Sequence, residues 1–258
     1  MKIGFFDSGL GGLIILKAVI ELMPDFDYVF YGDTANLPYG DKTEKEIFEL
    51  TKMGIEFLFD RNCSLVIIAC NTSSAETLRK IQNDFIPKTY PDRKVLGVII
   101  PTVETVIDSN PKQITILNTK RTAESKKYEF ELSKFKPQVP ITSIATPTLV
   151  PFIEGGRIDE AIKTISELIA KRKITGVVVL GCTHYSVLKN KLAEVCKGKG
   201  LQFFAQDEII PEKLKSYLEN HLEIKNELGL NKTRNIFLTK HTNQYDDLIE
   251  ELLNGKFT

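Results

Sequence analysis

The sequence predicts an α/β protein with two pseudo-symmetric parallel-sheet domains and an active site in the cleft between them. Short apolar strands alternate with helical segments along the chain, an order typical of parallel sheets with crossover helices. Two stretches, 66–75 and 178–186, also resemble each other: each runs from an apolar strand through a cysteine into small polar residues. Because Cys70 and Cys182 lie almost half a chain apart, they indicate two related halves that face each other.

The composition is that of an ordinary globular protein. The chain has 258 residues, 42% hydrophobic and 26% charged, with a formal net charge of zero. The zero charge argues against a nucleic-acid partner, because no basic excess is available to neutralise phosphates. No apolar run approaches the roughly 18 residues that span a bilayer, and Asp7 and several glycines interrupt the N-terminal stretch, unlike a signal peptide. We therefore expect a cytoplasmic protein without membrane association.

Residues 1–93 and 210–258 are expected to form the first domain. A buried strand opens the chain, and a second strand ends in a loop of turn-forming residues between Gly32 and Gly40. Thr43 and Glu46 have the spacing of a capping box, which predicts a helix start. The predicted strands are 2–6, 28–31, 65–69 and 235–239, and the predicted helices are 13–22, one opening at 43, 72–85, 211–221 and 245–253.

Residues 94–209 are expected to form the second domain, after a linker at 87–93. We place its first strand at 95–99 and expect Pro101 to stop it, because proline cannot donate to a strand ladder. Further strands are predicted at 113–117, 139–145, 177–180 and 201–204, and helices at 103–107 and 159–170. Residues 222–234 are predicted to be a charged connector.

The glycine-rich loop after the first strand reads Asp7-Ser8-Gly9-Leu10-Gly11-Gly12. It lacks the third glycine of the dinucleotide-binding fingerprint at the required spacing, so that cofactor is not indicated. The glycines allow a ligand to approach the backbone, and the following helix start offers free N–H groups. Asp7 and Ser8 can contact such a ligand or simply cap the helix, and the two roles are compatible.

The four cysteines divide into two pairs. None forms a C-x-x-C pair or a zinc-binding spacing, so neither a metal site nor a disulfide framework is expected. Cys63 and Cys196 are interpreted as buried small hydrophobic residues. Cys70 and Cys182 each stand at the end of a predicted strand among polar residues, which favours a chemical role.

Ligands of open parallel sheets bind beyond the carboxyl ends of the strands. Here those ends carry thiols, hydroxyls and amides with few cations, which suits a small acid bound by neutral donors. The side chains concerned are Asp7-Ser8, Asp33 to Gly40, Cys70-Asn71-Thr72, Asn118-Thr119, Glu154 and Cys182-Thr183-His184.

Two opposed thiols can invert a carbon centre. A thiol pKa near about 8.5 lets one cysteine remove a proton as thiolate while the other returns one as thiol from the opposite face. Asp7 is a candidate to assist Cys70, and His184 to assist Cys182, although His184 can instead be a packed or capping residue. Glu154 stands alone in an apolar stretch, with a helix-surface position as the alternative. His221 and His241 are expected on the surface.

Four motifs together resemble the glutamate racemase family in order and spacing across nearly the whole chain: 6–12, 31–40, 69–72 and 180–184. The resemblance implies cofactor-independent racemisation of glutamate that supplies D-glutamate for peptidoglycan, with a C-terminal segment that returns to the first domain. It implies that Cys70 acts on the α-proton of D-glutamate and Cys182 on that of L-glutamate, assisted by Asp7, Glu154 and His184. The implied substrate contacts are Asp7, Ser8, Tyr39, Gly40, Asn71, Thr72, Thr119, Thr183 and His184. We expect a homodimer.

The chain departs from the family pattern at three places. Ser73 replaces a usual alanine, Ala205-Gln206-Asp207 a usual Ser-Gly-Asp, and Thr239-Lys240-His241 a usual Thr-Gly-Asp. We expect the last two to affect peripheral loops, the domain interface or regulation more than the reaction.

Four alternatives stay open. An aspartate racemase is a related two-cysteine enzyme, although the Phe-Asp-Ser-Gly start favours glutamate. A maleate-type isomerase would use one thiol to attack carbon. A two-domain binding module for acidic amino acids would need neither thiol. A pyridoxal-phosphate racemase would need a Schiff-base lysine, for which the sequence offers no compelling candidate.

Overall fold

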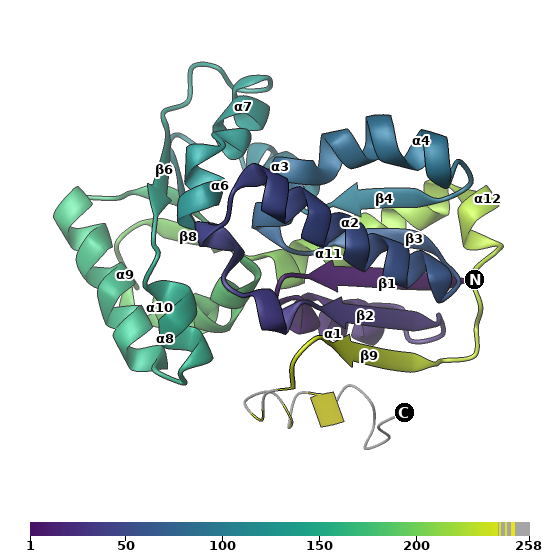
Figure 1. Cartoon of the computed structure of the whole chain (residues 1–258). Coiled ribbons are helices and arrows are strands. Elements are labelled where there is room, and N and C mark those ends of the chain that lie inside the picture. The colour runs from purple at the N-terminus through teal and green to yellow at the C-terminus, as the bar shows by residue number, and fades with distance from the viewer. Residues whose placement is uncertain (242, 244–245, 247–248, 251–258) are drawn as a thin grey trace.

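Two parallel β-sheets, each covered by helices on both faces, make up the chain (Figure 1). The computed structural model describes residues 1–241 together with 243, 246, 249 and 250. The five-stranded sheet has the order β4-β3-β1-β2-β9 and the four-stranded sheet the order β6-β5-β7-β8. Each strand pairs in parallel with its neighbours. The predicted fold class, α/β with two parallel sheets, is confirmed.

The five-stranded sheet is buried on both faces, which is why its central strands are almost uninterrupted apolar runs. Helices α1 and α11 pack on one face and α2 and α3 on the other. The strands are β1 (Lys2–Asp7), β2 (Tyr28–Gly32), β3 (Cys63–Ile68), β4 (Lys94–Gly97) and β9 (Arg234–Leu238). The helices are α1 (Gly12–Leu22), α2 (Glu44–Asp60), α3 (Asn71–Lys80), α4 (Ile86–Thr89), α11 (Gln206–Asn220) and α12 (Leu222–Lys225).

The four-stranded sheet is built in the same way. Helices α8, α9 and α10 pack on one face, and α5 and α7 on the other. Its strands are β5 (Ile114–Asn118), β6 (Ile141–Ala145), β7 (Gly176–Gly181) and β8 (Leu201–Phe204). The helices of this half are α5 (Ile99–Asp108), α6 (Lys120–Glu124), α7 (Lys127–Ser133), α8 (Leu149–Glu154), α9 (Ile158–Arg172) and α10 (Lys189–Val195).

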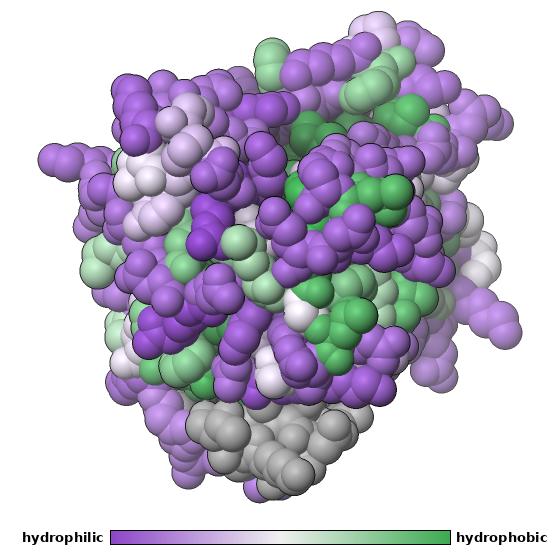
Figure 2. All heavy atoms as spheres, turned by 90° about the vertical axis from the view of Figure 1, so that its right-hand side faces the viewer, coloured by the Kyte–Doolittle hydropathy of each residue, from purple (hydrophilic) through white to green (hydrophobic). Residues whose placement is uncertain are grey.

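The carboxyl ends of the five-stranded sheet point toward the other half, as the arrowheads in Figure 1 show. Figure 2 views the opposite end, where hydrophilic residues predominate and hydrophobic ones form separate patches. The chain crosses to the second sheet through α5 and returns through α11, and these two helices contact each other. Strand β9 then joins the first sheet beside β2. Polar loops from both sheets therefore meet at the junction of the two halves.

The structure corrects the start of the second half. Strand β4 pairs with β3 through Val95 and its neighbours, so it is an edge strand of the first sheet and not the opening strand of the second unit. It ends at Gly97, and Pro101 lies in the first turn of α5 instead of ending a strand. A proline is tolerated there because the first helical N–H groups have no intrahelical acceptor. The domain boundaries expected from the sequence stay a prediction.

Smaller differences concern the helices. The helix predicted at 72–85 is α3 followed by a π-helical segment, Ile81–Phe85. Helix α11 begins at Gln206, earlier than predicted, and α12 lies within the predicted connector. The predicted closing helix 245–253 falls mainly outside the described residues. Among the described helices, none is both long and apolar enough to cross a membrane.

Candidate active site

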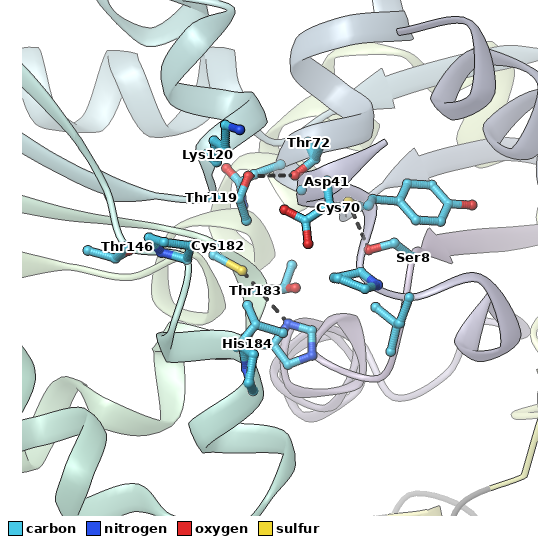
Figure 3. A pocket seen from close by; sticks show the side chains of 18 residues that line it. Ser8, Asp41, Cys70, Thr72, Thr119, Lys120, Thr146, Cys182, Thr183 and His184 are labelled. Carbon is cyan, nitrogen blue, oxygen red and sulfur yellow. Dashed lines mark hydrogen bonds between the residues drawn. The ribbon is translucent and has the colours of Figure 1, made fainter. Parts of the chain in front are cut away.

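Both cysteines of the repeated stretches line one cavity between the two sheets. The space that water-sized molecules can occupy inside it measures about 60 Å³, so the cavity is small. Figure 3 shows Cys182 beside His184 on one side of the view and Cys70 near Ser8 on the other. Ten of the twelve residues expected in the site line this cavity: Ser8, Tyr39, Gly40, Cys70, Asn71, Thr72, Thr119, Cys182, Thr183 and His184.

Cys70 lies where β3 gives way to α3. It is the N-cap of that helix, and its sulfur accepts a long hydrogen bond from the Ser73 N–H group (3.4 Å). The hydroxyl oxygen of Ser8 lies 3.1 Å from the same sulfur. Burial raises the pKa of the Cys70 thiol, and the negative charge of Asp7 raises it further. The surroundings of Cys70 therefore favour the protonated thiol.

Asp7 lies behind Ser8, away from the cavity surface. One carboxylate oxygen accepts hydrogen bonds from the Ser8 hydroxyl and the Gly9 N–H group, both 3.2 Å long. The side chain is fully buried, and burial raises the pKa of its carboxyl group, against the opposing effect of charge on His184. Asp7, Ser8 and Cys70 thus form a continuous chain of polar contacts that reaches the cavity.

Cys182 follows β7 and precedes the 3-10 helix η4 (Thr183–Leu188). Its sulfur lies 3.7 Å from Nδ1 of His184, and Nε2 of the same ring is hydrogen-bonded to Glu154 at the end of α8. Burial disfavours the imidazolium, but the hydrogen bonds to Cys182 and Glu154 outweigh it and hold the pKa of His184 well above its ordinary value. A charged His184 can donate to Cys182 and to Glu154 at the same time.

Glu154, like Asp7, is not on the cavity wall. Neither of the two carboxylates expected to assist the cysteines therefore lines the cavity itself. Asp7 is hydrogen-bonded to the cavity residue Ser8, and Glu154 to the cavity residue His184. A carboxylate in this position can set the protonation of the residue in front of it without contacting a ligand.

The glycine-rich loop brings the two halves into contact. A Cβ atom at Gly11 would lie 2.5 Å from Oγ1 of Thr183 and 2.7 Å from the backbone nitrogen of His184. Only a glycine leaves room for that turn, so the loop packs directly on the segment that carries the second cysteine. Gly40 approaches Thr119 in a similar way, since its Cβ would lie 3.1 Å from that of Thr119.

Hydroxyl groups also join the halves at the cavity. The hydroxyl of Thr72, at the start of α3, lies 3.0 Å from that of Thr119 and 3.2 Å from that of Thr122. The Thr119 side chain in turn caps α6 by accepting from the Thr122 N–H group. The three threonines hold two helix N-termini from opposite halves side by side.

Leu37 and Pro38, from the strand-end stretch 33–40, also line the cavity, together with six residues that the sequence analysis did not single out. Thr146 directly follows β6, and Lys120 lies two residues after the end of β5, so the strand-end rule could have found them. Lys120 and Asp41 add one positive and one negative side chain to the cavity lining, where few cations were expected (Figure 3). The six are Asp41, Lys120, Thr146, Pro147, Val150 and Pro151.

Two segments that depart from the family pattern, 205–207 and 239–241, contact residues at or next to the cavity. The Thr239 hydroxyl donates to Oδ1 of Asp33 (2.9 Å), whose other oxygen accepts from the hydroxyl of the cavity residue Tyr39 (2.6 Å). Gln206 is fully buried and hydrogen-bonded to Asn71, which directly follows Cys70. The expectation that 205–207 and 239–241 affect peripheral loops, the domain interface or regulation more than the reaction stays a prediction, although Gln206 contacts the cavity residue Asn71 directly.

The cysteines and histidines outside the site lie largely where they were expected. Cys63 and Cys196 are buried, and His241 is exposed. His221 is only half-exposed, because its ring stacks on Tyr217 with centroids 4.0 Å apart. Within the described part of the chain, no group of three histidine, cysteine or acidic side chains is placed to hold a metal ion.

Comparison with known proteins gives a consistent picture, although no family model matches the chain. A curated glutamate racemase of Phenylobacterium zucineum is 32% identical over 279 residues, covering 99% of this chain and 98% of its relative. That of Roseobacter denitrificans is 34% identical over 236 residues, with 86% of each covered. The crystal structure of the Francisella tularensis glutamate racemase in complex with D-glutamate superposes with a TM-score of 0.83 at 26% identity, covering 100% of this chain and 95% of that one.

Proposed function

The chain belongs to the glutamate racemase family of isomerases, and from that premise we propose that it interconverts L- and D-glutamate using Cys70 and Cys182 as the two acid–base groups. The observation that carries the proposal is that both thiols line a single cavity between the two sheets. The binding of D-glutamate by the Francisella tularensis relative supports glutamate as the substrate.

In the L-to-D direction, the thiolate of Cys182 removes the α-proton of L-glutamate. The electron pair of the broken C–H bond stays on the α-carbon and delocalises into the adjacent carboxylate. The thiol of Cys70 then transfers its proton to the opposite face, so that a new C–H bond forms with inverted configuration and Cys70 becomes the thiolate. The D-to-L direction reverses each step. Both directions need one thiol and one thiolate, which exchange roles at each turnover.

Each cysteine has its own assisting groups in this scheme. A charged His184, supported by Glu154, stabilises a thiolate at Cys182 by donating to its sulfur. At Cys70, the Ser8 hydroxyl can accept the thiol proton while passing its own to Asp7. The raised pKa of Cys70 favours its role as proton donor when L-glutamate enters. The mechanism requires no cofactor.

We propose that the substrate carboxylates are bound by hydroxyl and N–H donors, chiefly Ser8, Thr72, Thr119 and Thr183 together with Asn71. The N-terminus of the ten-residue helix α3 directs its free N–H groups and dipole toward the Cys70 side, which favours an anion there. Lys120 adds a positive charge among the residues that line the cavity. Tyr39 and Gly40 form the part of the wall next to Thr119.

The product D-glutamate is proposed to enter peptidoglycan synthesis, as the family resemblance implies. A cytoplasmic location and a homodimeric assembly, both expected from the sequence, stay predictions.

The test is racemisation of either enantiomer without added cofactor, followed by circular dichroism, for the wild type and for Cys70→Ala and Cys182→Ala. The expected result is activity in the wild type and its loss in both variants. Aspartate serves as the comparison substrate. Racemisation that survives in either single variant, or that proceeds better with aspartate, would contradict the proposal.

A further inference from the structure

Gln206 occupies the centre of a buried hydrogen-bond network at the junction of the two halves. It begins α11, the helix by which the chain returns to the first sheet, and its side chain is fully buried. Its amide nitrogen donates to Oδ1 of Asn71 (2.8 Å), and the Asn71 nitrogen donates back to Oε1 of Gln206 (2.7 Å). The Tyr128 hydroxyl, from α7, also donates to Asn71 Oδ1 (2.7 Å).

Asn71 is the partner that connects this network to the cavity. It directly follows Cys70 and lines the cavity wall. Its oxygen already accepts two hydrogen bonds, from Gln206 and Tyr128, so its capacity as an acceptor is occupied. Its nitrogen carries two hydrogens, of which Gln206 accepts one. The second N–H is the polar group that Asn71 can offer to a ligand.

The orientation of the two amides follows from a neighbouring hydroxyl. A threonine hydroxyl has a single proton, and that of Thr102 is donated to the backbone oxygen of Val98 (2.7 Å). Thr102 can therefore only accept from Gln206, 3.4 Å away, which requires the Gln206 nitrogen on that side. In this orientation the oxygen of Gln206 faces the nitrogen of Asn71, and the Gln206 nitrogen also lies 3.2 Å from the Tyr128 hydroxyl. Reversing both amides would place the Gln206 oxygen against the Thr102 hydroxyl, which has no proton to give, and would draw the proton of Tyr128 away from Asn71.

We propose that Gln206 is a positioning residue, which holds the Asn71 amide so that an N–H group and not its oxygen faces the substrate. The inference rests on the proposed function, in which the ligand is glutamate. An N–H donor stabilises a bound carboxylate, whereas an amide oxygen in the same place would repel it. The effect is equal for both enantiomers, because both present carboxylates to the same cavity wall.

The first test is Gln206→Met, which keeps the length of the side chain and removes its hydrogen bonds. The expected result is a KM for L- and D-glutamate that rises at least about tenfold, the size of one hydrogen bond to a charged group, with kcat nearly unchanged. The matched control is Gln82→Met. Gln82 donates to the backbone oxygen of Val95 (2.7 Å) in the first half and does not line the cavity, so its loss is expected to affect stability but not KM.

The second test is Gln206→Glu, read as a pH profile of KM. A protonated carboxyl group can accept from the Asn71 nitrogen and donate to its oxygen, as the glutamine does, but an ionised one cannot donate. KM is therefore expected to approach the wild-type value at low pH and to rise with pH, while melting temperatures measured in parallel identify any loss of folded protein. A purely structural role would not give this rescue by protonation.

The outcomes separate the two proposals. A wild type that fails to racemise glutamate would overturn the proposed function and the substrate named here. An active wild type beside a Gln206→Met variant with unchanged KM, or a Gln206→Glu variant whose KM does not depend on pH, would overturn the positioning role alone.

Discussion

The Ser8 hydroxyl oxygen lies 3.1 Å from the sulfur of Cys70 and 3.2 Å from a carboxylate oxygen of Asp7. No equivalent of this contact exists at Cys182 among the described residues, where the sulfur instead faces the ring of His184 at 3.7 Å. The two thiols therefore occupy related positions at strand ends but different electrostatic surroundings. Near Cys70 the nearest titratable group is the Asp7 carboxyl, whose charge raises the pKa of the thiol, whereas near Cys182 it is His184, whose pKa is raised by its hydrogen bonds to Cys182 and Glu154.

If Ser8 relays a proton between Cys70 and Asp7, the two residues act as one unit. Ser8→Ala and Asp7→Asn are each expected to lower kcat by about a hundredfold, the lower end of the range for general acid–base assistance. The kcat of the double variant is expected to equal that of the less active single variant, because either change alone interrupts the relay. Steady-state kinetics in both directions measures this. Effects that multiply in the double variant would show that the residues act separately.

Glu154→Gln is expected to shift the pH dependence of the reaction. The hydrogen bonds to Cys182 and Glu154 raise the pKa of His184, so the imidazolium persists to higher pH than in a free histidine. Without the carboxylate, the alkaline limb of kcat/KM is expected to move to lower pH by about one unit. An unchanged limb would contradict the coupling of Glu154 to His184.

The same change should appear in stability. A pKa raised in the folded state stabilises the protein fully below the unfolded pKa of histidine, near about 6.5, and the benefit disappears as pH rises through the folded value. The free energy of unfolding of Glu154→Gln, measured with urea, should therefore fall furthest below wild type at acidic pH, with the gap closing at alkaline pH. A gap that widens with pH would contradict the assignment.

Thr239 supports the cavity loop from a distance. Its hydroxyl donates to Asp33 and accepts from the Ala35 N–H group, and Asp33 in turn accepts from Tyr39. Thr239→Val is expected to raise KM severalfold and to cost about 1 kcal/mol of stability, through the lost hydrogen bonds. Kinetics and urea unfolding of the purified variant provide both values.

The matched control is Thr233→Val. Thr233, which immediately precedes β9, donates its hydroxyl to Asp27 (2.8 Å), far from the cavity residues. A similar loss of stability with unchanged KM is expected. A rise in KM of equal size in both variants would mean that strand β9 affects the cavity only through general stability.

Local patterns predicted most of the fold. Thr43 and Glu46 form the capping box that their spacing indicated, with the Thr43 side chain and the Glu46 side chain each accepting from the other's backbone N–H group. The choice of strand partners is not local, which is why β4 was assigned to the wrong sheet: its own residues fit either edge. The prediction that Pro101 stops a strand was wrong for a related reason, because its position in a first helical turn depends on where α5 begins.

The residues of the site also differ in whether the local sequence could predict them. Residues directly after strands could be placed from sequence, since parallel strands bring their carboxyl ends together. Val150 and Pro151 reach the cavity from α8 instead, and no strand-end signal marks them. Gln206 and Asn71 are 135 positions apart, and Thr239 and Asp33 are 206 apart. Contacts of that range follow from the packing of the two halves and cannot be read from the pattern around either residue.

The central claim, that two thiols act on opposite faces of one carbon, is tested most directly by isotope incorporation in deuterated water. In the first few per cent of conversion of L-glutamate, the D-glutamate formed should carry deuterium at the α-carbon, while the remaining L-glutamate keeps its proton. This is expected because Cys182 takes the substrate proton and Cys70 supplies a solvent-derived deuteron. Deuterium that enters the remaining substrate as fast as the product, or a product that retains the substrate proton, would show a single base and contradict the account.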